Sequence, residues 1–170
     1  MNLLNSLTFG SVRVFLLCSL YLHCFAYPLY AENSIDFCFT STAEKYGIDP
    51  LLLEAISYVE SRNNPLAISR NDAQSIDYGH MQINSYWIKY LGVNYLKLND
   101  PCFCTKVGAA ILVNCIDTHG LNANALSCYN SGKKMASLTQ EVKPKVIAYI
   151  DKVKRRYDHL AKNPKKGIDG

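Results

Sequence analysis

The sequence is poor in several features that define whole classes of proteins. Only 19% of its 170 residues are charged while 49% are hydrophobic, which excludes a disordered chain and a coiled coil. The 9 glycines and 6 prolines follow no collagen-like repeat. No internal repeat and no interdomain linker is visible. We therefore expect one globular domain with a sizeable core.

A recognisable metal-binding pattern is also missing. Cys102 and Cys104 form only a C-x-C pair, with no second pair and no histidine at the spacing of a zinc site. We expect no bound metal.

Charge is distributed unevenly. Residues 133–170 hold 11 basic and 4 acidic residues, a net charge of +7, whereas residues 1–132 have a net charge of −3. Nucleic acid, anionic lipid and acidic polymers are the usual partners of such a basic segment. Because its charges alternate with periodic apolar residues, we interpret it as the solvated face of a terminal helix and expect no nucleic-acid partner.

The N-terminal segment has the pattern of an export signal. Arg13 is the only charged residue in residues 1–31, and it precedes an apolar run over residues 14–22. This run is short for a bilayer span but suits the core of a signal peptide. Cleavage is expected after Ala26 or Ala31. A lipoprotein and an uncleaved membrane anchor are the alternatives.

Removal of the signal would leave five of the seven cysteines, so at least one thiol stays free or pairs between chains. Export to an oxidising compartment favours a disulfide. The pair that we favour joins Cys38, in the first helix, to Cys102. Cys115 lies in an apolar helical run and is interpreted as a small buried hydrophobic residue.

Apolar periodicity predicts a mainly α domain over residues 32–162, followed by a frayed basic tail over residues 163–170. Residues 61–79 break the helical pattern with Asn, Asp and Gly, which predicts a long polar loop with a β-turn or a small hairpin. A long loop inside a compact domain is usually functional. About six short helices are expected, at residues 37–46, 49–60, 84–92, 100–120, 122–132 and from about Thr139 or Pro144 onward.

Glu60 is the strongest candidate for chemistry. It ends an apolar helix and opens onto the polar loop. Partial desolvation there would raise its pKa and keep it protonated near neutral pH, as a general acid requires. The alternative is an ordinary surface glutamate, although a negative charge near a helix C-terminus opposes the helix dipole.

Four motifs in a fixed order give this carboxyl a context. They are Glu60-Ser61, residues 77–84 (DYGHMQIN), residues 128–132 (CYNSG) and Tyr149. This order resembles the soluble lytic transglycosylase family, which has the goose-type lysozyme fold and the motifs E-S, G-L-M-Q-I, A-Y-N-A-G and a late tyrosine on a helix. The export signal, Cys38 and residues 100–102 (DPC) look most like the small branch that accompanies type III secretion, type IV pili and conjugation machinery. The resemblance covers residues 36–157.

The resemblance assigns roles to the residues that match these motifs. Glu60 matches the catalytic acid and base. The glutamine of the second motif shapes the groove beside the acid, the Tyr-Asn pair lines the saccharide cleft, and the late tyrosine lies near the catalytic carboxyl. The implied substrate-binding residues are Ser61, Gln82, Tyr129, Asn130 and Tyr149.

Three positions depart from the family pattern. His80 replaces the usual leucine, and its imidazole would tune Glu60 if it lay close by; a satisfied or solvent-facing histidine is the alternative. Cys128 replaces an alanine and is a candidate for the odd thiol. Ser131 replaces the small alanine after Tyr-Asn.

Asp77 is a candidate for a second catalytic carboxylate. Retaining glycosidases use two carboxyl groups, although many lytic transglycosylases lack the second. Asp77 directly precedes the second motif, where the secretion-associated branch tends to carry an aspartate, so we expect a supporting electrostatic role. The alternative is a turn residue that holds the loop.

The resemblance implies cleavage of the β-1,4 bond between N-acetylmuramic acid and N-acetylglucosamine in peptidoglycan, with closure of a 1,6-anhydro ring and without a cofactor. It also implies a monomer in a Gram-negative periplasm, serving a secretion, pilus or conjugation apparatus. Two alternatives remain. One is a hydrolytic muramidase that uses Glu60 and Asp77, and the other is a non-catalytic wall-binding component.

Overall fold

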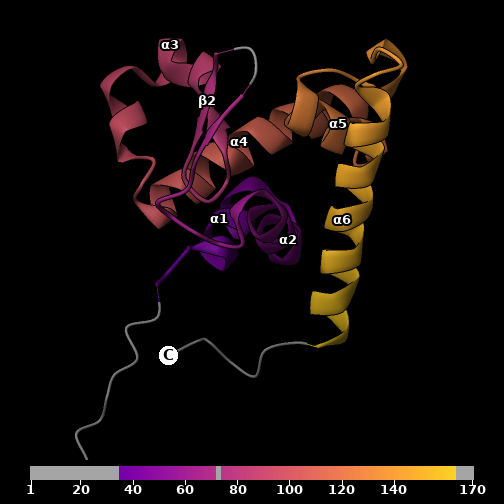
Figure 1. The fold of residues 1–170 in the computed structure, drawn as a ribbon. Helices are drawn as coiled ribbons and strands as arrows, with labels where there is room; N and C mark the ends of the chain where they lie inside the picture. The colour runs from indigo at the N-terminus through magenta and orange to yellow at the C-terminus, as the bar shows by residue number, and fades with distance from the viewer. Residues whose placement is uncertain (1–34, 72–73, 164–170) are drawn as a thin grey trace, which may run out of the picture. The chain divides into compact units, whose positions relative to one another are not determined.

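The computed structural model describes residues 35–71 and 74–163. The expected signal peptide and residues 164–170 of the expected tail lie outside this part of the chain. Within it, the fold is mainly α, with six α-helices and a small three-stranded sheet, and the predicted fold class is confirmed (Figure 1). The helices are α1 (Phe39–Tyr46), α2 (Pro50–Ser61), α3 (Ile88–Leu91), α4 (Pro101–His119), α5 (Ala123–Ser131) and α6 (Lys143–Lys162).

Two aspartates begin the main helices, as their sequence context predicts. The Asp49 carboxylate accepts the backbone N–H of Leu51 at 2.8 Å, and the Asp100 carboxylate accepts that of Phe103 at 2.6 Å. Each is followed by a proline at the first helical position. The caps satisfy backbone donors that the helices cannot use internally, so α2 and α4 start at defined residues.

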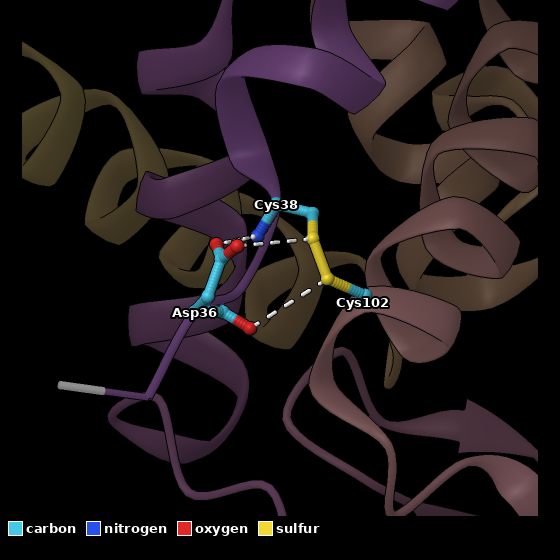
Figure 2. Close-up of side chains that lie close together, drawn as sticks. All are labelled: Asp36, Cys38 and Cys102. Atoms are coloured by element: carbon cyan, nitrogen blue, oxygen red, sulfur yellow. Dashed lines mark hydrogen bonds between the residues drawn. A yellow bond between two sulfur atoms is a disulfide. The ribbon is translucent and has the colours of Figure 1, made fainter. Parts of the chain in front are cut away.

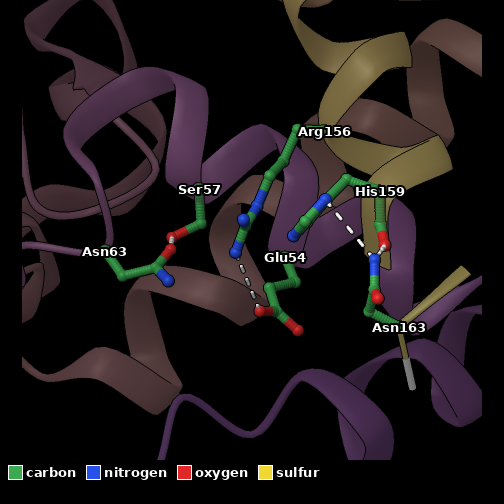
Figure 3. Close-up of polar contacts among 6 residues, drawn as sticks. All are labelled: Glu54, Ser57, Asn63, Arg156, His159 and Asn163. Atoms are coloured by element: carbon green, nitrogen blue, oxygen red, sulfur yellow. Dashed lines mark hydrogen bonds and ion pairs between the residues drawn. The ribbon is translucent and has the colours of Figure 1, made fainter. Parts of the chain in front are cut away.

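The core forms where α2 packs against α1 and α6, and where α4 packs against α1 and α5. Leu53 and Ile56 of α2 and Val153 of α6 are fully buried within it. At the edge of the α2–α6 contact, Arg156 lies 3.6 Å from Glu54 (Figure 3). The helix that carries Glu60 is therefore held on two sides by other helices.

The polar segment after α2 folds into an antiparallel sheet in the order β1 (Ile68–Arg70), β2 (Ile76–Tyr78) and β3 (Ile83–Asn84). The sequence predicted a loop with at most a small hairpin here. Asp77 pairs with Ser69 on one side and with Asn84 on the other. The sheet thus places a short run of polar side chains beside the end of α2.

The predicted helix over residues 84–92 is only partly present. Short 3₁₀ turns, η1 (Ser85–Trp87) and η2 (Gly92–Lys97), flank the single turn of α3, and a third, η3 (Met135–Ser137), precedes α6. Val93 and Leu96 of η2 are more than 80% exposed. A regular helix at this point would need a buried apolar stripe, which the exposed side chains do not supply.

Two disulfides cross-link the described residues. The structure joins Cys38 to Cys102, the pair favoured from the sequence, and the carboxylate of Asp36 accepts the Cys38 backbone N–H at 2.7 Å beside it (Figure 2). Cys115 pairs with Cys128. The interpretation of Cys115 as a simple hydrophobic residue and of Cys128 as the odd thiol is therefore wrong. Among the cysteines that the structure describes, the free thiol is Cys104 in the core, and burial raises its pKa to about 12.

Among the described helices, none combines the length and the apolar character that crossing a membrane requires.

Candidate active site

A cleft of about 690 Å³ opens where α2, the sheet, α4 and α5 meet. Five of the seven residues predicted as catalytic or substrate-binding line it, although they come from three separate motifs. They are Glu60, Asp77, Gln82, Tyr129 and Asn130. The other two, Ser61 and Tyr149, are not among its lining residues.

Glu60 is in the last turn of α2 and faces the cleft with a partly buried side chain. Burial raises its pKa from 4.5 to about 7, the Tyr149 hydroxyl lowers it, and the negative charge of Asp77 raises it. Burial dominates, because removing water penalises the carboxylate more than its neighbours stabilise it. A large fraction of Glu60 is therefore protonated at neutral pH, which is the state of a general acid.

Asp77 is held by two amide side chains. The Nδ2 atoms of Asn71 and Asn84 donate to its carboxylate at 2.8 and 2.6 Å. Asn84 is its partner in the β2–β3 register, so the sheet itself brings the amide to the acid. The carboxylate thus has a fixed position in the cleft wall, where its charge acts on Glu60.

A tight turn, residues 79–82, carries the second motif between β2 and β3. Three side-chain hydrogen bonds hold its backbone: Ser61 Oγ donates to the His80 carbonyl at 2.9 Å, Tyr129 Oη to the Met81 carbonyl at 3.0 Å, and Gln82 Nε2 to the Gly79 carbonyl at 2.9 Å. The Ser61 hydroxyl therefore holds the turn. The motif residues fix one another as well as line the cleft.

Glycine is required at the start of this turn. Gly79 has a φ of +71°, and a Cβ there would collide with the Leu98 carbonyl and the Cys104 sulfur. Gly108 of α4 gives similar room on the other side, because a Cβ there would lie 2.6 Å from the end of the Met81 side chain. The turn therefore sits closer to the core than any larger residue permits.

Tyr149 of α6 is buried beside Glu60. Its hydroxyl has no partner in good hydrogen-bonding geometry within the described residues, yet it lies near enough to lower the pKa of Glu60. Burial, together with the charge of Glu60, raises the pKa of Tyr149 well above its ordinary value. It is a neutral donor placed behind the carboxyl.

His80 is a buried structural residue. Its Nδ1 lies 2.7 Å from Ser57 Oγ and its Nε2 lies 3.0 Å from the Pro101 carbonyl, and it does not line the cleft. The Ser57 hydroxyl also lies 2.6 Å from Asn63 Oδ1 (Figure 3). Burial lowers the pKa of His80 to about 4. Of the two interpretations, the satisfied histidine is the one that the structure supports.

Several lining residues were not singled out in the sequence as cleft residues. Five of them are amides or aromatics, the side chains that bind sugar hydroxyls and pack on sugar rings, and the Cys115–Cys128 disulfide also lies in the wall. The pairing of Asn84 with Asp77 depends on the strand register, which the sequence alone does not reveal. For the aromatic residues, the only signal in the sequence was the segment over residues 84–87 (NSYW), which begins at the last residue of the second motif. The additional lining residues are Asn71, Ile83, Asn84, Tyr86, Trp87, Ile111, Asn114, Cys115, Cys128, Ser131 and Gly132.

One group of the described residues has the composition of a metal site. Ligand atoms of Asp36, Cys38 and Cys102 lie within 4.8 Å of one another (Figure 2). Both sulfurs are used by the disulfide, so the thiolates that a metal would need are not available.

The cleft, the acid and the ordered motifs can be compared with known families. The family model described as "Transglycosylase SLT domain" matches residues 37–163. The chain belongs to this family. The match spans every described helix and strand, so the family predicted from the sequence motifs is confirmed.

Known relatives of this SLT-domain protein include bacterial proteins of similar size. Invasion protein IagB of Salmonella typhi is 37% identical over 99 residues, which cover 56% of this chain and 62% of that relative. Protein IpgF of Shigella sonnei is 30% identical over 132 residues, 75% of this chain and 84% of the relative. A putative peptidoglycan-binding-like protein of Escherichia coli K12 is 32% identical over 134 residues, 71% of this chain and 83% of the relative.

Proposed function

We propose that this protein is a lytic transglycosylase that cleaves the β-1,4 bond between N-acetylmuramic acid and N-acetylglucosamine in peptidoglycan. The observation that carries the proposal is Glu60: a carboxyl with a pKa of about 7 facing a polar cleft. Membership of the SLT-domain family and the name of the Escherichia coli relative support the choice of substrate.

In the first step, protonated Glu60 donates its proton to the bridging oxygen while the bond from that oxygen to the muramic C1 breaks. Positive charge develops at C1 in an oxocarbenium-like transition state. The negative charge of Asp77, fixed by Asn71 and Asn84, lies in the same cleft and stabilises this charge.

In the second step, the Glu60 carboxylate takes the proton of the sugar's own C6 hydroxyl, and O6 attacks C1. The 1,6-anhydro ring closes, Glu60 is again protonated, and no water is consumed. An intramolecular nucleophile has a large effective concentration, so one well-placed acid and base suffices. Tyr149, behind Glu60, is placed to stabilise the carboxylate between the two steps.

We further propose that the protein acts in the periplasm and opens the wall locally for a secretion, pilus or conjugation apparatus. The name of the Salmonella relative, an invasion protein, supports this role. The basic residues of α6 add a weak, salt-dependent attraction to the anionic wall.

The test is mass spectrometry of the fragments released from purified sacculi by the exported protein, by Glu60→Gln and by Glu44→Gln. Glu44 is an exposed glutamate of α1 outside the cleft, so its variant controls for the change of charge. We expect anhydro-muramyl products from wild type and Glu44→Gln, and at least a roughly 100-fold loss in Glu60→Gln.

Other products would point elsewhere. Fragments heavier by one water would mean a hydrolytic muramidase, with Asp77 as the next residue to replace. Sacculus binding without release, equal in wild type and Glu60→Gln, would mean a non-catalytic wall-binding protein.

A further inference from the structure

A second pocket of about 680 Å³ adjoins the cleft. It lies between the segment η1–α3–η2, helix α4 and the end of α1. Its walls include the aromatic side chains of Tyr46, Trp87, Tyr90 and Phe103. None of the sequence motifs or the catalytic steps above uses this pocket.

The two pockets are continuous along one face of α4. Phe103, Val107 and Ile111 recur at a spacing of four residues, which places them on one side of the helix. Ile111 and Asn114 line both pockets, as does Trp87. From Phe103 to Asn114 this face runs about 16 Å along the helix axis. A ligand in the cleft therefore meets the second pocket without leaving the surface of α4.

The two pockets differ in chemistry. Glu60, Asp77 and several amides line the cleft, which suits a neutral, hydroxyl-rich sugar. Of the described residues that line the second pocket, none is a carboxylate, and the one charged residue is Lys106. Lys106 is exposed, and no acidic group lies within ion-pair distance of it among residues 35–71 and 74–163. An unpaired ammonium beside aromatic walls suits a ligand that is anionic and partly apolar.

We propose that the second pocket binds the peptide stem of the peptidoglycan strand whose glycan occupies the cleft. The stem is attached to the muramic residue, carries free carboxylates and contains alanine methyl groups. Lys106 pairs with a stem carboxylate, while Tyr90 and Phe103 contact the apolar part. The inference rests on the proposed function, and it assigns to this chain a preference for strands that keep their peptides.

The first test compares two substrates, intact glycan strands and strands stripped of their peptides by an amidase. We expect Lys106→Ala to raise KM for the intact strands roughly three- to fivefold, as expected for one exposed charge pair, and to leave kcat unchanged. On stripped strands its KM should equal that of wild type. Lys97→Ala removes the same charge from η2 outside both pockets and should alter neither. Equal effects of Lys106→Ala on both substrates, or no effect on either, would overturn the proposal.

A second test does not depend on catalysis. Trp87 is the only tryptophan of the chain and lines both pockets, so its fluorescence reports their occupancy. In Glu60→Gln, we expect the soluble disaccharide tetrapeptide to bind more tightly than the disaccharide alone, and Lys106→Ala to remove the difference. Equal binding of the two ligands would refute the peptide site. Tighter binding of the tetrapeptide, together with a wild-type protein that releases no fragments from sacculi, would reject the enzymatic function alone.

Discussion

At the scale of single residues, the free energy of ionisation of Glu60 is the property on which the site depends. Its pKa of about 7 results from burial, opposed by Tyr149 and reinforced by Asp77. The two neighbours act in opposite directions, so replacing each in turn separates an electrostatic role from a merely structural one.

We expect Asp77→Asn and Tyr149→Phe to shift the alkaline limb of the profile of kcat/KM against pH in opposite directions. Asp77→Asn removes the charge that raises the pKa of Glu60, so activity falls at a lower pH than in wild type. Tyr149→Phe removes the hydroxyl that lowers this pKa, so activity persists to a higher pH. Shifts of both variants in the same direction would contradict the assignment.

Glu60 could be chosen from the sequence because it ends an apolar helix before a polar loop and is the first residue in the ordered set of motifs that resembles the family. The sequence was also sufficient for Gln82, Tyr129 and Asn130, which occur in contiguous motifs. Asn71 and Asn84 were missed because their contact with Asp77 depends on strand register. The Cys115–Cys128 pair was missed because facing positions on two helices are not visible in sequence spacing.

At the scale of elements, the turn over residues 79–82 connects α2, α5 and the sheet. It could not be foreseen that Ser61 and Tyr129 use their hydroxyls on this turn, since a motif shows which residues recur and not what they contact. The starts of α2 and α4 at Asp49 and Asp100 were predicted well, because N-terminal capping is a local property of the sequence. The segment after β3 was predicted less well, because its conformation depends on packing.

We expect Tyr129→Phe to lower the free energy of unfolding by about 1–3 kcal/mol, since it leaves the Met81 carbonyl without its donor. KM should also rise, because the turn positions Gln82. Urea unfolding with the disulfides intact measures the first effect. Tyr86→Phe is the control: Tyr86 also lines the cleft but its side chain is 58% exposed, so its loss of a hydroxyl should change stability little. Equal stability of the two variants would show that the turn does not depend on Tyr129.

At the scale of the whole molecule, two disulfides contribute to different properties. Cys38–Cys102 closes a loop of 64 residues and Cys115–Cys128 one of 13. Loop entropy then predicts that replacing the first pair with alanine costs about 4 kcal/mol and the second about 3 kcal/mol. The loss of activity should follow the reverse order and be larger for the second pair, because of the two pairs only the second lines the cleft. Urea unfolding measures the loss of stability and sacculus digestion measures the loss of activity. The same order of loss in both measurements would contradict the prediction.

Burial shifts the pKa values of Glu60 and His80 in opposite directions, so the two groups change the free energy of unfolding in opposite directions as pH varies. The pKa of Glu60 is raised to about 7, so its contribution to stability is lost as pH rises from 4.5 to 7. The pKa of His80 is lowered to about 4, so its contribution is lost as pH falls from 6.5 to 4. In wild type the two slopes oppose each other between about pH 4.5 and 6.5.

Glu60→Gln should reveal the contribution of His80. We expect the free energy of unfolding of this variant to rise with pH between about 4 and 6.5 and then to level. At pH 8 the variant should be more stable than wild type by up to roughly 3 kcal/mol. Denaturant titrations at each pH measure this difference, and a difference independent of pH would contradict the raised pKa of Glu60.

The disulfide in the cleft wall has a further consequence for timing. Helices α4 and α5 bring Cys115 and Cys128 together, but an oxidant must complete the bond between them. A newly made chain in a reducing compartment would therefore contain Glu60 but lack the Cys115–Cys128 bond in the wall of the groove. We therefore expect the groove to reach its final form only once the two thiols have been oxidised, so that synthesis of the chain and the onset of its activity are separate events.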